Sequence, residues 1–177
     1  MNNSESAQLT YARAAGFTFI FYIVSGITSL SLGSQTKVAE VLFLLQNFSA
    51  LVLGVTLYML TYKQGSALAM LALTCRVLEA VHEQSAIFFA VGSLLFAWLF
   101  LRGRLIPTIL AQLGVLASAL LVVILPAQLA GFFGGSTSWA SSVTWLVWMP
   151  MLLFEVIFAF WLMFKGVNNK QLQPELL

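Results

Sequence analysis

The sequence predicts an all-α fold, a polytopic membrane protein built as a single six-transmembrane-helix bundle with N- and C-termini cytoplasmic. Three observations predict it. Of the 177 residues, 60% are hydrophobic and 8% are charged, whereas soluble domains carry about 25% charged residues. The charges separate apolar runs close to the length of about 20 residues that crosses a bilayer core. Basic residues also gather in alternate loops, which indicates an orientation in the membrane.

Four of the six helices can be read directly from apolar runs that end at short polar stretches. The first and second runs are separated by the polar segment 33–37, and Lys63-Gln64-Gly65 ends the second. Pro107 opens the fifth, where it suits a first helical turn because no backbone donor is needed there. These four helices are expected at residues 12–32, 38–62, 107–131 and 142–165.

The stretch 66–101 is too long to be one transmembrane helix. Its 36 residues would rise about 54 Å, well beyond a bilayer core of about 30 Å. The polar break within it is His82-Glu83-Gln84-Ser85. A division at this break predicts a third helix at 66–81 and a fourth at 86–101, both near the lower length limit for crossing.

Basic residues support six spans rather than five. With six spans, one side of the membrane holds only Lys37, and the other holds both termini with Arg13, Lys63, Arg102, Arg104, Lys165 and Lys170. With five spans this asymmetry weakens and reverses. Because short loops rich in Lys and Arg stay in the cytoplasm, we expect both termini and the basic loops to be cytoplasmic.

Three ionisable residues lie deep in the predicted helices. Arg76 lies about 15 Å into the third helix, Glu79 lies one turn further along it, and Glu155 has a similar depth in the sixth helix. An unpaired charge there costs about 2.5–3.5 kcal/mol or more, so these side chains should face the interior and pair. We favour an Arg76–Glu155 pair over Arg76–Glu79. The set is either a site for a ligand, ion or proton, or an ion network that holds the helices together.

Other polar residues flank these charges on the side away from the termini. They are Gln46, Asn47, His82, Glu83 and Gln128. Pro126 and Pro150 are expected to interrupt the fifth and sixth helices and free two carbonyl groups. Together these features predict a polar cavity that opens outward. The alternative is that the amide side chains simply hold neighbouring helices together.

Glycines and small residues in the fourth and fifth helices predict close helix packing. They are Gly92, Ser93, Ala111, Gly114, Ala117 and Ser118.

The candidate metal ligands are Glu79, His82 and Glu83. The spacing Glu79-Ala-Val-His82 would aim two side chains at one helix face, as in the di-metal sites of helical bundles. It supports an intramembrane metal-dependent hydrolase as a minor hypothesis. A set with one histidine is poor in nitrogen ligands, so neither a metal nor a cofactor is expected and enzymatic activity is not favoured. The chain shows no phosphate-binding loop and no basic footprint for nucleic acid.

Several motifs in the chain resemble a known family. They are Arg76-Val-Leu-Glu79-Ala80, Arg102-Gly-Arg-Leu-Ile-Pro107, and, in the last helix, Pro150, Glu155, Trp161-Leu162 and Lys165-Gly166. In order and spacing the set resembles a bacterial membrane-protein family catalogued only as a domain of unknown function, over about residues 66–167. The resemblance implies six helices in a bacterial plasma (inner) membrane, with Arg-x-x-Glu in the third helix and Glu in the last. It implies no activity, and the fourth helix lacks the polar Gly-Leu-His stretch that is usual in the family.

Two classes of function therefore stay open. In the first, the protein is not an enzyme, and the buried Arg76, Glu79 and Glu155 bind or transport a small ligand, lipid or ion. In the second, the chain is an accessory or structural subunit of a larger membrane complex, a hypothesis suggested by its short tails and thin polar content. Its partners beyond the lipid bilayer would then be other membrane subunits or a second copy of itself.

Overall fold

The computed structural model describes residues 3–32, 36–82, 85–132 and 142–168, which are helical along most of their length. The elements in chain order are α1 Asn3–Leu32, α2 Lys37–Thr61, the 3-10 helix η1 Tyr62–Gln64, α3 Ser66–Val81, α4 Ser85–Arg102, α5 Thr108–Leu129 and α6 Ser142–Phe164. The predicted all-α fold is confirmed, and so is the division of the stretch 66–101 into two helices. The largest departure is α1, which begins at Asn3 rather than at residue 12.

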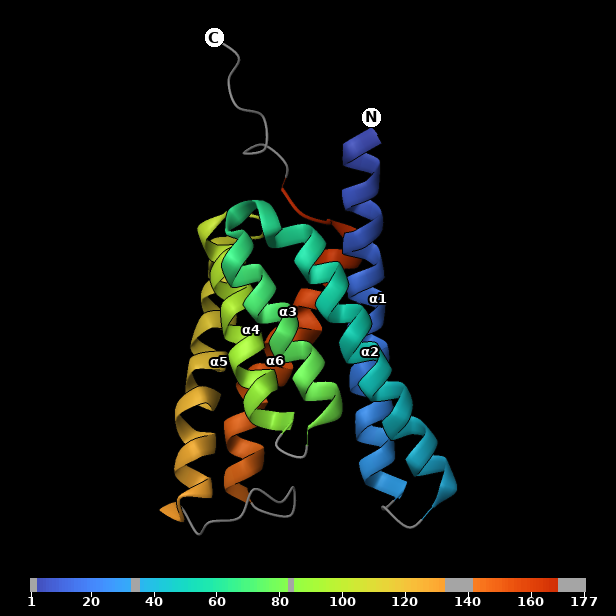
Figure 1. Cartoon of the computed structure of the whole chain (residues 1–177), viewed down its shortest axis with the longest axis vertical. Coiled ribbons are helices and arrows are strands. Elements are labelled where there is room, and N and C mark those ends of the chain that lie inside the picture. The colour runs from blue at the N-terminus through green and yellow to red at the C-terminus, as the bar shows by residue number, and fades with distance from the viewer. Residues whose placement is uncertain (1–2, 33–35, 83–84, 133–141, 169–177) are drawn as a thin grey trace.

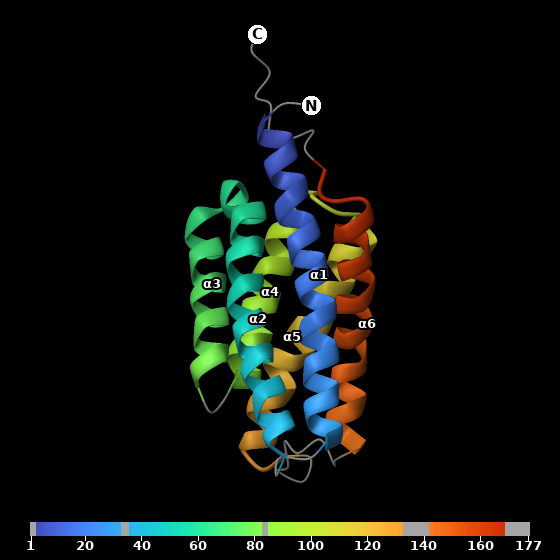
Figure 2. The ribbon, with the colours of Figure 1, turned by 90° about the vertical axis from the view of Figure 1, so that its right-hand side faces the viewer.

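The helices form a closed ring in chain order. Each one packs against the next, and α1 completes the ring by packing against α6. Because successive helices run in opposite directions, α1 begins and α6 ends at the same end of the bundle (Figures 1 and 2). We call this the terminal end and the opposite end the far end.

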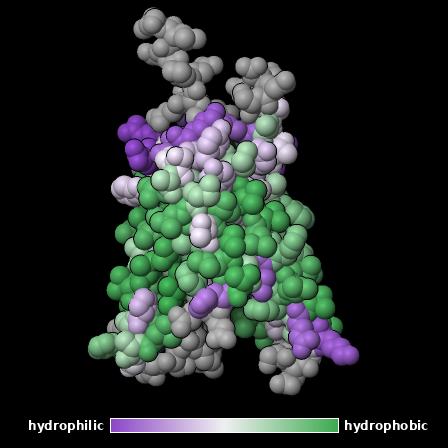
Figure 3. Space-filling view, viewed as in Figure 1, coloured by the Kyte–Doolittle hydropathy of each residue, from purple (hydrophilic) through white to green (hydrophobic). Residues whose placement is uncertain are grey.

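The surface of the bundle fits a protein embedded in a membrane. Five helices, α1, α2, α4, α5 and α6, are long and apolar enough to cross one. The sixth, α3, has 16 residues and rises only about 24 Å. On the face seen in Figure 3, apolar residues cover the middle of the molecule, and hydrophilic residues gather mainly at the terminal end, with a few near the far end. The number of crossings and the side of the membrane that holds the termini stay predictions.

The α3–α4 hairpin is shorter than the rest of the bundle. These two helices have 16 and 18 residues, whereas the other four have 22 to 30. In Figures 1 and 2 their far-end tips lie nearer the middle of the bundle than the far-end tips of the other helices. The ring is therefore incomplete at the far end, where α1, α2 and α6 extend beyond the hairpin.

Four phenylalanine side chains pack together in the interior of the bundle. The ring of Phe158 on α6 contacts those of Phe19, Phe100 and Phe154, with centroids 5.6, 5.0 and 5.2 Å apart. All four side chains are buried. Buried aromatic pairs contribute about 0.5–1.5 kcal/mol beyond the area they bury. This phenylalanine cluster, formed by Phe19, Phe100, Phe154 and Phe158, joins α1, α4 and α6.

Glycines allow three of the helix pairs to approach closely. A Cβ atom at Gly16 would lie 2.5 Å from the carbonyl oxygen of Ala159, across the contact between α1 and α6. At Gly92 it would lie 3.1 Å from Cβ of Cys75, and at Gly114 2.6 Å from the ring of Phe154. The predicted close packing is therefore confirmed at Gly92 and Gly114.

The two internal prolines do not interrupt their helices, contrary to our expectation. Pro126 lies inside α5 and Pro150 inside α6, and both helices continue through them. Loss of one backbone hydrogen bond is tolerated because the rest of each helix remains hydrogen-bonded and packed against its neighbours.

Candidate functional site

A buried ion pair lies near the middle of the bundle. Nη1 of Arg76 lies 2.7 Å from Oε2 of Glu79, one turn further along α3, and the two side chains are 1% and 5% exposed. Our preference for an Arg76–Glu155 pair was therefore wrong. Residues at i and i+3 share one helix face, so Glu79 reaches the guanidinium without any constraint on how α6 is rotated.

Three helices hold the side chain of Arg76. Its Nη2 donates a hydrogen bond to Oγ of Ser93 on α4, at 3.3 Å, and its guanidinium carbon lies 4.8 Å from the ring centroid of Phe89. On α2, a Cβ at Gly54 would lie 2.8 Å from Cβ of Arg76. The absence of a side chain at Gly54 thus makes room for the arginine. Nη1 and Nη2 of the guanidinium donate to Glu79 and Ser93, whereas Nε is buried without a hydrogen-bond partner.

Both carboxylate oxygens of Glu79 have partners. Oε2 accepts from Arg76, and Oε1 accepts from the hydroxyl of Tyr22 on α1 at 2.8 Å. The ring of Tyr22 is parallel to that of Phe89, with centroids 6.4 Å apart, and Phe89 in turn lies 5.2 Å from Trp148 of α6. Glu79 is therefore fully satisfied inside the protein.

Glu155 on α6 is buried but lacks this satisfaction. Its residue is 5% exposed, and its Oε1 has no hydrogen-bond partner. Among the residues that the structure describes, it forms no ion pair. It lies about 14 Å from the terminal end of α6, a depth close to that of Arg76 in α3. Burying a carboxyl group without a partner is costly, so this group needs water, a proton or a bound molecule.

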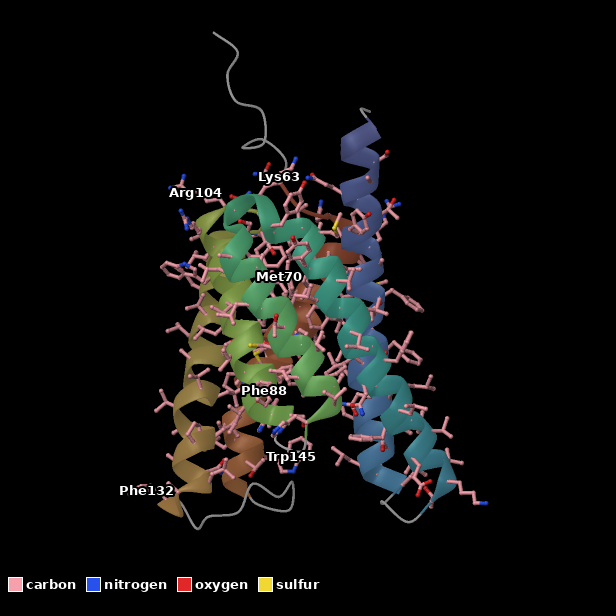
Figure 4. The ribbon with its side chains drawn as sticks, viewed as in Figure 1. Lys63, Met70, Phe88, Arg104, Phe132 and Trp145 are labelled. Carbon is pink, nitrogen blue, oxygen red and sulfur yellow. The ribbon has the colours of Figure 1, made fainter. Side chains whose placement is uncertain are left out.

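A cavity of about 260 Å³ lies beside this carboxyl group. Its deep end is formed by Tyr22, Glu79 and Glu155, and its walls come from α1, α2, α3, α4 and α6. Trp145 also lines it, and Figure 4 shows this residue near the far end. Trp145 precedes Glu155 by ten residues on α6, a rise of about 15 Å. The cavity thus runs from the bundle middle toward the far end, where the short α3–α4 hairpin leaves the ring incomplete.

The structure brings together some of the predicted site residues and not others. Glu79, Glu155 and Gln46 line the cavity, and Arg76 is joined to it through Glu79. Asn47 is half-buried and Gln128 is fully buried, but neither lines the cavity. Gln128 was expected to contribute to the same polar space, and that expectation is wrong because its side chain is buried elsewhere, on α5.

The predicted metal set is not assembled. The spacing of Glu79 and His82 places both on one face only if the helix continues, but α3 ends at Val81 and His82 has extended backbone angles. His82 is exposed and its ring packs against Phe88, whereas Glu79 is buried and ion-paired. Glu83 lies outside the described residues. Within the part of the chain that the structure describes, no group of His, Cys, Asp or Glu side chains is arranged to hold a metal ion.

Sequence reasoning missed Tyr22 and the aromatic residues around it. Tyr22 carried a usable signal, because it lies ten residues into the apolar run 12–32, far from the interfaces where tyrosine is common. A hydroxyl at that depth needs a hydrogen-bond partner. Phe89 and Trp148 carried no such signal, since apolar aromatic residues are ordinary in apolar helices.

One family model matches the chain, and its description is Domain of unknown function (DUF4386). The match covers residues 81–166, from the last residue of α3 through α6. The resemblance to a family catalogued only as a domain of unknown function is thus confirmed over this part. Glu155 lies within the match, whereas Arg76 and Glu79 precede it, so their place in a family motif stays a prediction. Neither the curated proteins nor the solved structures gave a match.

Proposed function

We propose that the protein is an integral membrane protein that binds a small molecule in the cavity between α1, α2, α3, α4 and α6. The observation that carries this proposal is Glu155, a buried carboxyl group that faces a cavity and whose Oε1 has no partner in the protein. The carboxyl group of Glu155 is thus left without a partner at Oε1, although most residues around it are apolar. Such violations of polar satisfaction are found at functional sites.

The volume of the cavity favours a small ligand. At about 260 Å³ it lies just below the range of about 300–1,000 Å³ that is common for ligand pockets. It is too small for a two-chain phospholipid. Apolar walls with a few polar groups at one end are the usual construction of a small-molecule site.

The orientation that we propose places the cavity on the outer side of the membrane. Exposed basic residues lie at the terminal end, among them Lys63 and Arg104, which Figure 4 labels there. Short basic loops stay in the cytoplasm, so the far end would face outward. In a Cys75→Ala background, a Lys63→Cys variant should react with an impermeant maleimide only after cells are opened. Labelling in intact cells would contradict this orientation.

The phenylalanine cluster favours binding over an open passage. Phe158 lies one turn nearer the terminal end than Glu155, and its ring packs against that of Phe100 in the buried interior, with centroids 5.0 Å apart. A ligand at Glu155 would therefore enter and leave by the far end in the conformation described. Transport would require that this cluster separate, as in proteins that alternate access around a fixed midplane site.

Cavity filling tests the proposal. Ala86 is half-buried and lines the cavity, so Ala86→Phe should fill it. The matched control is Leu116→Phe on α5, where the residue is 69% exposed and outside the cavity. Binding is measured in lipid nanodiscs with three small aromatic probes: benzyltrimethylammonium, its uncharged isostere neopentylbenzene, and phenylacetate. At least one should bind to the parent protein and to Leu116→Phe, but not to Ala86→Phe. No binding by any probe, or equal binding to both variants, would refute the proposal.

A further inference from the structure

The charges at the deep end of the cavity do not balance. The charge of Glu79 is compensated by Arg76, whose Nη1 lies 2.7 Å away. The remaining guanidinium contacts of Arg76 go to Ser93 and to the face of Phe89. Glu155 has no cation of its own among the described residues. With all groups ionised, the deep end therefore carries one uncompensated negative charge.

Aromatic rings line the route to this charge. Tyr22, Phe89, Trp145 and Trp148 all contribute to the cavity wall. The faces of aromatic rings attract cations, and tryptophan does so most strongly. The ring of Phe89 already lies 4.8 Å from the guanidinium carbon of Arg76, so the site uses this interaction internally.

The residues that line the cavity also favour an organic cation over a metal ion. A metal ion needs several oxygen or nitrogen ligands, and the described residues contain no cluster of acidic, histidine or cysteine side chains arranged for one. Toward the far end the lining is mainly apolar, apart from Ser29, Gln46 and Ser85. It is also partly open, since Leu30, Phe43 and Trp145 are 51%, 55% and 45% exposed. This surface suits an apolar body that enters from the membrane interface.

We infer that the ligand is a small organic cation, an amine or quaternary ammonium with an apolar body, whose positive charge lies against Glu155. This inference rests on the proposed function and names its ligand class. The cation supplies the charge that Glu155 lacks, the aromatic rings surround it, and the apolar body occupies the volume toward the far end. An anion would meet the uncompensated carboxylate, because Arg76 is already paired.

The charge preference of the site tests the inference. Benzyltrimethylammonium and neopentylbenzene have the same shape and differ in charge. Their dissociation constants are obtained from the ligand-dependent rise in melting temperature of the nanodisc-embedded protein. The parent protein should bind the cation about tenfold or more tightly than its isostere. Glu155→Gln should abolish that preference while the melting temperature without probe stays the same or rises.

Two further variants keep the test decisive. Glu155→Met replaces the carboxyl group with an apolar group of similar length and serves if the glutamine variant folds poorly. Glu40→Gln removes an exposed carboxyl group in the first turn of α2 and should leave the preference unchanged.

Each outcome separates the inference from the proposed function. Equal binding of the two isosteres, tighter binding of phenylacetate, or a preference that survives in Glu155→Gln would refute the cation and leave a ligand-binding cavity. Failure of every probe to bind would refute the proposed function and the inference together.

Discussion

The two halves of the bundle are formed by the same helices but differ in how their interiors are packed. On the terminal side of Glu155, Phe158 packs against three other phenylalanine rings, and all four side chains are buried. Toward the far end, the short α3–α4 hairpin leaves room for a cavity and for Glu155, whose Oε1 has no partner. The proposed function accounts for the difference, because a binding site keeps a polar group that stability alone would not leave without a partner.

The same contrast recurs within the polar cluster. Glu79 has a cation and a hydroxyl as partners, whereas Glu155 at a similar depth has neither. Under the proposed function, Glu79 contributes to stability and Glu155 to ligand binding. The following variants test this division, in order of the expected loss of stability.

Removing Glu79 should be the most damaging change. Glu79→Ala leaves the guanidinium of Arg76, which is 1% exposed, without its counter-ion. Breaking a buried ion pair from one side costs about 3–5 kcal/mol. The free energy of unfolding is measured by SDS titration in mixed micelles. The double variant Arg76→Met/Glu79→Leu should recover most of the loss, because no buried charge remains. If Glu79→Ala had the same free energy of unfolding as the parent, the ion pair would have no structural role.

Truncation in the phenylalanine cluster should cost somewhat less. Phe158→Ala removes ring contacts with Phe19, Phe100 and Phe154. In a membrane the loss of hydrophobic transfer free energy is small, because lipid is as apolar as the protein core. The free energy of unfolding should therefore fall by the cost of the lost contacts and the cavity left behind, about 2–3 kcal/mol. Phe43→Ala is the control at the cavity mouth, where the residue is 55% exposed and the cost should be below about 0.5 kcal/mol. If Phe158→Ala and Phe43→Ala lowered the free energy of unfolding equally, the two halves of the bundle would be packed alike.

A pair of glycines on α1 makes the same comparison along one helix. A Cβ at Gly16 would lie 2.5 Å from the backbone of Ala159, whereas at Gly26 its nearest neighbour is the flexible end of Gln46, at 2.8 Å. A backbone atom cannot move aside, so Gly16→Ala should lower the free energy of unfolding by about 1–3 kcal/mol. Gly26→Ala should change it by less than about 0.5 kcal/mol. Both are measured by the same SDS titration, and the reverse order would overturn the contrast.

The hydroxyl of Tyr22 should have a smaller effect. Tyr22→Phe removes the hydrogen bond to Oε1 of Glu79 but keeps the ring against Phe89. Hydrogen bonds between membrane helices contribute about 0.6 kcal/mol on average and up to about 1.7 kcal/mol, so the loss should lie in that range. Thr28→Val is the control, because Thr28 is exposed on the same helix and its hydroxyl donates only to the carbonyl oxygen of Val24, one turn earlier in that helix. A loss no larger than that of the control would show that the Tyr22 bond is not stabilising.

Much of the fold could be predicted because apolar run length and polar breaks encode it locally. The predicted helix at 66–81 coincides with α3, Ser66–Val81. The similar depth of Arg76 and Glu155 also followed from the helical rise alone. The partner of Arg76 did not follow, because it depends on how α3 and α6 are rotated about their axes. His82 was misplaced because one residue beyond a helix end no longer shares its face.

The cavity was only partly predictable for a similar reason. Polar residues near the far end suggested it, and Gln46 and Glu79 do line it. Its cause is the difference in length between the α3–α4 hairpin and its neighbours, which is a property of several helices together. Gln128 is polar and lies near the far end of α5, but its side chain is buried and does not line the cavity.

Glu155→Gln should have the smallest effect on stability, and this result would sharpen the contrast with Glu79 most. Oε1 of Glu155 has no hydrogen-bond partner, and the carboxyl group forms no ion pair among the described residues. The substitution therefore breaks no such interaction and replaces an ionisable group with a neutral one of the same shape. Removing an uncompensated buried charge is neutral or stabilising, so the free energy of unfolding should stay within about 0.5 kcal/mol of the parent value or rise above it. A loss comparable to that of Glu79→Ala would show that Glu155 stabilises the helices as Glu79 does, and the division between a structural and a ligand-binding carboxylate would no longer hold.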